Sequence, residues 1–158
     1  MTHPHYTLDR CLQEWDLRRL FNEGHYEDKV KRDELIPRLE RSNPLKPNKI
    51  ATLKNVKPGA RTETILYLDL NDNLVVELHR YKNPDGSLGG PARKNDPKTI
   101  IIDGVKYHRA SPNDPKPPRL KSREVNAILH KHGLAATVTY FLTVKGHLRH
   151  LVFLLIRR

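Results

Sequence analysis

The chain has 158 residues, of which 37% are hydrophobic and 30% are charged, and its formal net charge is +11 at pH 7. This length and composition predict one compact domain, residues 1–158, with an apolar core of its own. The single cysteine excludes an intramolecular disulfide framework and a cysteine-based zinc site. The sequence shows neither a secretory signal pattern nor an apolar run of about 20 residues. We therefore expect a cytoplasmic protein that does not associate with membranes.

The positive charge is concentrated in the second half of the chain. Residues 1–43 contain 8 Lys and Arg against 9 Asp and Glu, whereas residues 91–158 contain 14 against 4. A positive field confined to one part of a protein is typical of a surface that binds phosphates or another polyanion.

The N-terminal part, residues 1–41, is predicted to form a pair of helices. Thr7 is suited to cap the first helix. The spacing i, i+3, i+4, i+7 predicts one apolar helical face made by Leu8, Cys11, Leu12 and Trp15. The second helix is expected from Tyr26 until shortly before Pro37, because proline cannot continue a helix.

Residues 42–60 contain several prolines and lysines, which favour a linker or an irregular sheet edge and disfavour a helix. A short strand is expected within this segment at Ile50–Leu53.

Residues 61–110 give the clearest β signals. Two β-rich runs between Ile65 and Tyr81 are joined by turn formers, and a second pair between Thr99 and His108 is joined by Asp103-Gly104. Asp-Gly between such runs predicts a two-residue hairpin turn, since both central positions need positive φ. The loop between the two hairpins, residues 83–98, is long enough to suggest a functional role.

The remainder of the chain is predicted to contain one helix and a third hairpin. Residues 111–121 form a proline-rich connector, and Ser122 is suited to cap a short helix that continues through Lys131. Residues 137–156 are expected to form a hairpin that ends in the apolar run 151–156, for which a helix is the competing interpretation. The predicted fold class is α+β: an N-terminal helical pair on a mainly antiparallel sheet of hairpins, with a short helix before a C-terminal hairpin within residues 122–158.

The long loop is the first candidate for binding. Gly86, Gly89 and Gly90 precede three cations, which predicts a flexible basic finger along a sugar-phosphate backbone. With the basic residues that follow, the predicted nucleic-acid contacts are Arg93, Lys94, Lys98, Lys106, Arg109, Lys116, Arg119 and Lys121.

The nine histidines do not predict a metal site. His130 and His132 point in different directions on a helix, and His147 and His150 emerge on opposite faces of a strand. No cysteine or HExxH pattern accompanies either pair, so neither a metal nor a cofactor is expected.

Two further histidines suggest an enzymatic alternative. If the strands on either side of the long loop pair with each other, His79 and His108 lie close together, beside Arg80 and Arg109. Two imidazoles can act as general acid and base in RNA cleavage, and an arginine can stabilise the phosphate.

Three functional hypotheses follow. The first is a small, non-enzymatic nucleic-acid-binding protein, with RNA slightly favoured over DNA and a regulatory or mobile-element role. The second is a metal-independent endoribonuclease of the toxin type that uses His79 and His108. The third is an adaptor or inhibitor that binds an acidic protein surface. The sequence does not indicate an oligomeric state.

Overall fold

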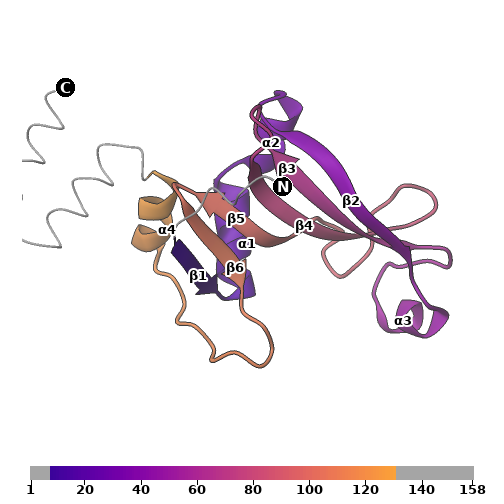
Figure 1. Ribbon diagram of the computed structural model, residues 1–158. Helices are drawn as coiled ribbons and strands as arrows, with labels where there is room; N and C mark the ends of the chain where they lie inside the picture. The colour runs from indigo at the N-terminus through magenta and orange to yellow at the C-terminus, as the bar shows by residue number, and fades with distance from the viewer. Residues whose placement is uncertain (1–7, 131–158) are drawn as a thin grey trace, which may run out of the picture.

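A computed structural model describes residues 8–130, which form a six-stranded sheet and four helices (Figure 1). The predicted α+β class is therefore confirmed. In chain order the elements are β1 (Leu8–Leu12), α1 (Glu14–Glu23), α2 (Tyr26–Lys31), β2 (Ile36–Pro44), α3 (Pro47–Thr52), β3 (Arg61–Leu68), β4 (Leu74–Lys82), β5 (Asp96–Ile102), β6 (Val105–Arg109) and α4 (Ser122–Leu129). The hairpin predicted at residues 137–156 lies outside the described residues.

The sheet has the strand order β1-β6-β5-β4-β3-β2. β1 runs parallel to β6, and every other neighbouring pair is antiparallel. The strands β3 to β6 follow one another as an antiparallel meander. Short turns join β3 to β4 and β5 to β6, whereas the long loop joins β4 to β5. The sheet is thus mainly antiparallel, as predicted, with one parallel strand added at an edge.

Both predicted hairpins form. The β3–β4 turn is held by Asp69, whose backbone N–H donates to the carbonyl of Asn73 at 2.9 Å and whose side chain accepts from the N–H of Asn71 at 2.9 Å. In the β5–β6 turn, Asp103 and Gly104 have φ angles of 50° and 73°. Positive φ at both central positions is the geometry that the Asp-Gly pair predicts.

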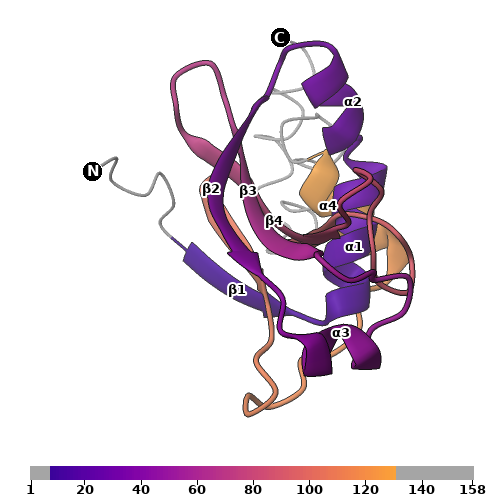
Figure 2. The ribbon, with the colours of Figure 1, turned by 90° about the vertical axis from the view of Figure 1, so that its right-hand side faces the viewer.

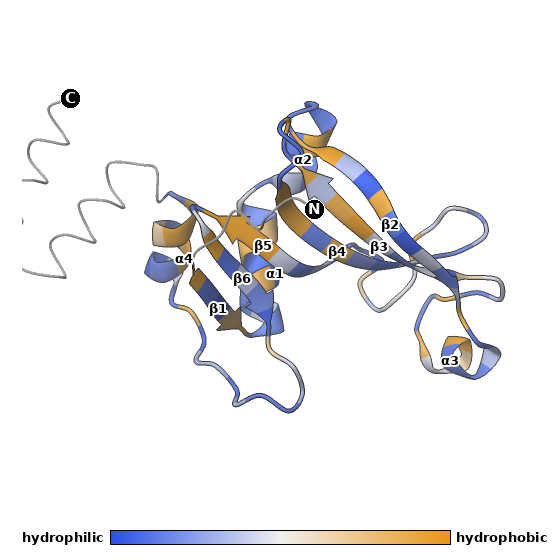
Figure 3. Cartoon of the chain, in the orientation of Figure 1, coloured by the Kyte–Doolittle hydropathy of each residue, from blue (hydrophilic) through white to orange (hydrophobic). Residues whose placement is uncertain are grey.

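The helices α1, α2 and α4 lie on the same face of the sheet, and α1 packs across β5 and β6 (Figure 2). Hydrophobic and hydrophilic residues alternate along parts of the strands (Figure 3), and successive residues of a strand point to opposite faces of the sheet. The fully buried centre of this core includes Leu12, Leu17, Leu20, Val76, Leu78, Ile100 and Val125.

The helix predicted from Leu8 is wrong in its first part. Leu8–Leu12 instead forms β1, which pairs in register with Val105–Arg109 of β6. The helix begins only at Glu14, with Glu14 and Asp16 in its first turn, where carboxylates are favourable near the helix dipole. Trp15, predicted to belong to the apolar face, is 58% exposed.

Residues 31–60 also differ from the prediction. α2 ends at Lys31, and an edge strand, β2, then occupies Ile36–Pro44 within and beyond the part expected to be helical. The strand expected at Ile50–Leu53 is instead largely the short helix α3, which Pro47 begins. Proline is well tolerated in the first turn of a helix, where its missing N–H would have no partner.

Residues 111–121 contain no helix or strand, in agreement with the predicted connector. The connector is attached to α1: the buried carboxylate of Asp16 accepts a hydrogen bond from the N–H of Leu120 at 2.9 Å, and the Gln13 amide donates to the carbonyl of Pro117 at 2.6 Å. α4 then begins at Ser122, but Lys121 and not Ser122 occupies the cap position. Among the described residues, no helix combines the length and the apolarity needed to cross a membrane.

Candidate functional site

A cleft of about 780 Å³ lies between α1 and the loop that joins β4 to β5, and we call it the α1 cleft. Seven cationic side chains line it, against two carboxylates, those of Glu14 and Asp96. The cations come from three separate parts of the chain: Arg18 and Arg19 of α1, Arg80 of β4, and Arg93, Lys94, Lys98 and Arg109 from the loop onward. The fold therefore gathers positive charge from both halves of the sequence at one cleft.

A second cleft, the connector cleft, has a volume of about 1080 Å³ and is lined by the start of α1, the end of β6 and residues of the connector, including Lys116. The two clefts adjoin, because they share five lining residues: Glu14, Trp15, Arg18, Lys98 and Arg109. Together they offer a ligand an extended path across the N-terminal end of α1.

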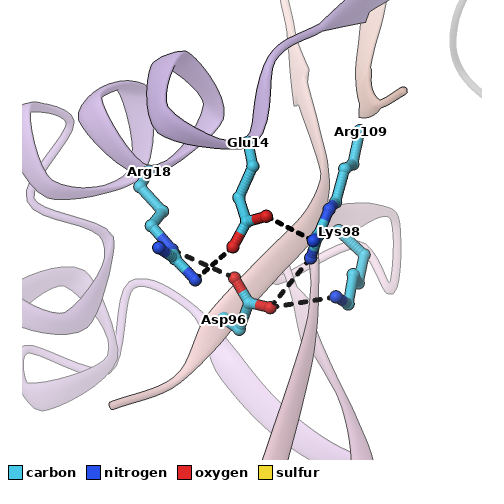
Figure 4. Close-up of polar contacts among 5 residues, drawn as sticks. All are labelled: Glu14, Arg18, Asp96, Lys98 and Arg109. Carbon is cyan, nitrogen blue, oxygen red and sulfur yellow. Dashed lines mark hydrogen bonds and ion pairs between the residues drawn. The ribbon is translucent and has the colours of Figure 1, made fainter. Parts of the chain in front are cut away.

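The boundary between the clefts is an ion-pair network (Figure 4). Asp96 contacts the Lys98 ammonium at 2.9 Å, the Arg109 guanidinium at 3.2 Å and the Arg18 guanidinium at 3.3 Å. Glu14 pairs with both Arg18 and Arg109. Three cations thus share two carboxylates, so the network keeps an excess of positive charge.

The pKa of Asp96 reflects this environment. Partial burial acts to raise the pKa, but the hydrogen bond and charge of Lys98, together with the charges of Arg18 and Arg109, hold it below its usual value. Asp96 is therefore ionised at neutral pH and fixes the three cations in place.

The structure brings only some of the predicted nucleic-acid contacts together. Arg93, Lys94, Lys98 and Arg109 line the α1 cleft, and Lys116 lines the connector cleft. The remaining three, Lys106, Arg119 and Lys121, line neither cleft.

Several of the predicted cations also have carboxylate partners. Lys98 and Arg109 belong to the network above, and the Arg119 guanidinium lies 3.5 Å from the Asp16 carboxylate. Among the described residues, Lys94 and Lys116 have no ion-pair partner, and the Arg93 guanidinium donates to the neutral side-chain amide of Asn55, at 2.8 Å. Of the predicted cations that line a cleft, Arg93, Lys94 and Lys116 consequently have the most capacity for an added anion.

The long loop is attached to the rest of the protein, which differs from the flexible finger predicted from its glycines. The Gly90 N–H donates to the carbonyl of Lys54 at 2.8 Å, and the buried amide of Asn83 donates to the carbonyl of Asn55 at 3.0 Å. Gly89 packs so tightly that a Cβ there would lie 2.6 Å from a methyl carbon of Val56. Arg93 and Lys94 therefore extend from a loop with a defined backbone.

The strands on either side of the long loop, β4 and β5, do pair, but this pairing does not bring the two histidines together, because His108 lies on β6. β5 lies between β4 and β6, so His79 is opposite Asp96 while His108 is opposite Thr99. By ordinary strand dimensions their backbones are about 10 Å apart across the sheet and about 10 Å apart along it. His79 lines the α1 cleft, whereas His108 lines the connector cleft and contacts the Asp9 carboxylate at 2.7 Å. The two imidazoles are not placed to act on one phosphate.

The surroundings of His79 favour its neutral form. Burial lowers its pKa, and the positive charges of Lys98 and Arg109 lower it further against the opposing effect of Asp96. Its ring packs edge-on against Tyr81, with 4.8 Å between the ring centroids. The two arginines of the enzymatic hypothesis are also paired, Arg80 with Glu63 at 2.7 Å and Arg109 with Glu14.

No family model matches the chain, and no curated protein or solved structure shows significant similarity to it.

The residues that the sequence prediction missed lie on α1. Trp15, Arg18 and Arg19 are spaced i, i+3 and i+4, which places them on one side of a helix. That spacing is visible in the sequence, but Trp15 had been assigned to the apolar face with Leu8 and Leu12. Within residues 8–130, no group of three or more His, Cys, Asp or Glu side chains is arranged to hold a metal ion.

Proposed function

We propose that this protein binds nucleic acid without cleaving it, through the α1 cleft and the adjoining connector cleft. The observation that carries the proposal is the lining of the α1 cleft by seven cations against two carboxylates. Cationic side chains that converge on one concave surface attract phosphates and exchange bound counterions for them.

The distribution of the cations supports an extended ligand. Arg93 and Lys94 lie at the loop side of the α1 cleft, Arg18 and Lys98 at the boundary, and Lys116 in the connector cleft. A single small anion would occupy one of these places, whereas a chain of phosphates can contact all of them in turn. We favour RNA over DNA as the ligand and a regulatory role in the cytoplasm, where a lone cysteine remains reduced.

The test is a salt titration of binding. The affinity for labelled RNA and DNA oligonucleotides is measured by fluorescence anisotropy between about 50 and 200 mM salt. We expect a steep loss of affinity with salt, because each phosphate contact on a single strand contributes about 0.7 to the slope of log K against log salt. An affinity that does not change with salt would contradict the proposal.

A charge-matched pair of variants locates the binding. Arg93→Gln with Lys94→Gln removes two cations of the α1 cleft, so the slope should flatten by about 1.4 for a single strand. Arg38→Gln with Arg41→Gln removes two exposed cations of the edge strand β2, which line neither cleft, and serves as the control. If both double variants reduce the slope equally, the protein binds through its net charge and the clefts have no special role.

A further inference from the structure

Trp15 is exposed at the place where the two clefts meet. It is the only tryptophan of the chain, it lines both clefts, and 58% of its surface is accessible. Burial of a large aromatic side chain stabilises a fold considerably. Leu17, Leu20 and Phe21, which follow Trp15 on α1, are all buried in the core. The position of the indole is therefore a feature that the packing of the core does not explain.

The indole is held in place on one side. The Arg119 guanidinium lies over the Trp15 ring, 5.7 Å from the ring centre, within the range of a cation–π contact. Arg119 is itself directed by Asp16, whose carboxylate lies 3.5 Å from its Nε and is fully buried. Because Asp16 also accepts the N–H of Leu120, the connector and α1 together fix both Arg119 and the ring. The indole is thus arranged before any ligand arrives.

We propose that Trp15 stacks on an unpaired base, so that the ligand of the two clefts is single-stranded nucleic acid. This inference rests on the proposed function. In a duplex each base is covered on both faces by its neighbours, whereas an unpaired base can leave the stack and lie against an aromatic ring. Arg18 and Lys98, which line both clefts beside Trp15, are placed to contact the phosphates on either side of that base.

The lone tryptophan allows a direct experiment on the unmodified protein. Single strands of RNA and of DNA, and a duplex of the same length, are added while tryptophan fluorescence and the anisotropy of the labelled oligonucleotide are both recorded. Stacking on a base quenches indole fluorescence, so we expect quenching by the single strands that saturates at the same concentration as the anisotropy. The duplex is expected to bind more weakly and to cause little quenching.

Variants provide a second measurement. Base stacking on an aromatic side chain corresponds to a loss of about 5- to 150-fold in affinity when the ring is removed. Trp15→Ala should therefore weaken single-strand binding within that range and leave duplex binding nearly unchanged, and Trp15→Phe should restore part of the loss. Leu70→Ala, at an apolar side chain that is 73% exposed and lines neither cleft, is the control and should change neither affinity.

The outcomes separate the two proposals. Salt-dependent binding without quenching, together with an unchanged affinity of Trp15→Ala, would overturn single-strand stacking and leave the proposed function intact. Equal affinity and equal quenching by the duplex would overturn the single-strand preference in the same way. If no oligonucleotide binds even at low salt, the proposed function fails as well.

Discussion

Replacing Asp16 by alanine tests how the connector is held against α1. Asp16 is fully buried, accepts the N–H of Leu120 at 2.9 Å, and lies 3.5 Å from Arg119 and 3.7 Å from Arg19. The Asp16→Ala variant loses one hydrogen bond to a charged group and leaves the Leu120 N–H without its acceptor. The connector should therefore be held less firmly, and the whole protein should unfold more easily.

The size of the destabilisation expected for Asp16→Ala depends on how exposed its two arginine partners are. Removing one member of a buried charge pair typically costs about 3–5 kcal/mol, and a hydrogen bond to a charged group contributes about 1.5–3 kcal/mol. The side chains of Arg19 and Arg119 are 21% and 54% exposed, so water can take the place of the lost carboxylate and the lower figures apply. We expect Asp16→Ala to lower the free energy of unfolding by about 3 kcal/mol, and the Tm by about 6–12 °C.

Urea unfolding followed by circular dichroism measures this loss, with two comparison variants. Asp16→Asn keeps an acceptor for the N–H of Leu120 but loses the charge, so its loss in free energy of unfolding should be about half of that of Asp16→Ala. Asp28→Ala removes a carboxylate from the first turn of α2 that is 53% exposed, and should cost less than about 0.5 kcal/mol. A loss for Asp16→Ala no larger than that for Asp28→Ala would refute this account of the connector.

Three further predictions concern the loop, a turn and pH. Gly89→Ala places a Cβ against Val56 and should therefore displace the long loop. We expect a free energy of unfolding lower by about 1–3 kcal/mol and weaker oligonucleotide binding, and one preparation of the variant serves to measure both. Gly104→Val puts a β-branched residue at a φ of 73° and should destabilise the β5–β6 hairpin by at least about 1 kcal/mol; an unchanged urea midpoint would contradict the turn geometry. The pKa of His79 is lowered in the folded state, chiefly by burial and by the charge of Lys98, so the unfolded state binds more protons below the ordinary histidine pKa. The contribution of His79 to stability should therefore be fully present above that pKa and decrease as the pH falls below it. In urea titrations between about pH 7.5 and pH 5.5, the free energy of unfolding of the His79→Asn variant should decrease less steeply than that of the unmodified protein.

The elements that depend on local rules were predictable from the sequence. The β3–β4 and β5–β6 hairpins follow from β-rich runs separated by turn formers, and the Asp103-Gly104 turn has the positive φ angles that its residues favour. The helix at 122–129 and the irregular connector before it were predicted for similar local reasons.

The errors arose where tertiary contacts decide between alternatives. The segment Leu8–Leu12 has helical apolar spacing, but the edge of β6 offers it backbone hydrogen bonds, which a pattern along the chain does not reveal. Tertiary contacts also decide which charged side chains pair with each other. The sequence predicts where the cations are, whereas only the fold shows that Glu14 and Asp16 partner Arg109 and Arg119.

The candidate site was predicted in part for the same reason. The loop cations Arg93 and Lys94 were found from their position after the glycines, and they do line a cleft. Arg18 and Arg19 were missed because residues 1–43 are nearly neutral overall. The net charge of a segment does not show whether a helix places its cations on one side, as α1 does with Arg18 and Arg19.

The central claim is that nucleic acid covers the two clefts and not the basic surface in general. Lysine acetylation in the presence and absence of a bound oligonucleotide, read by mass spectrometry, tests this at each position. We predict that Lys94 and Lys116 are protected several-fold more strongly than Lys31 of α2 and Lys46, which line neither cleft. Equal protection at all four lysines under saturating ligand would contradict the claim.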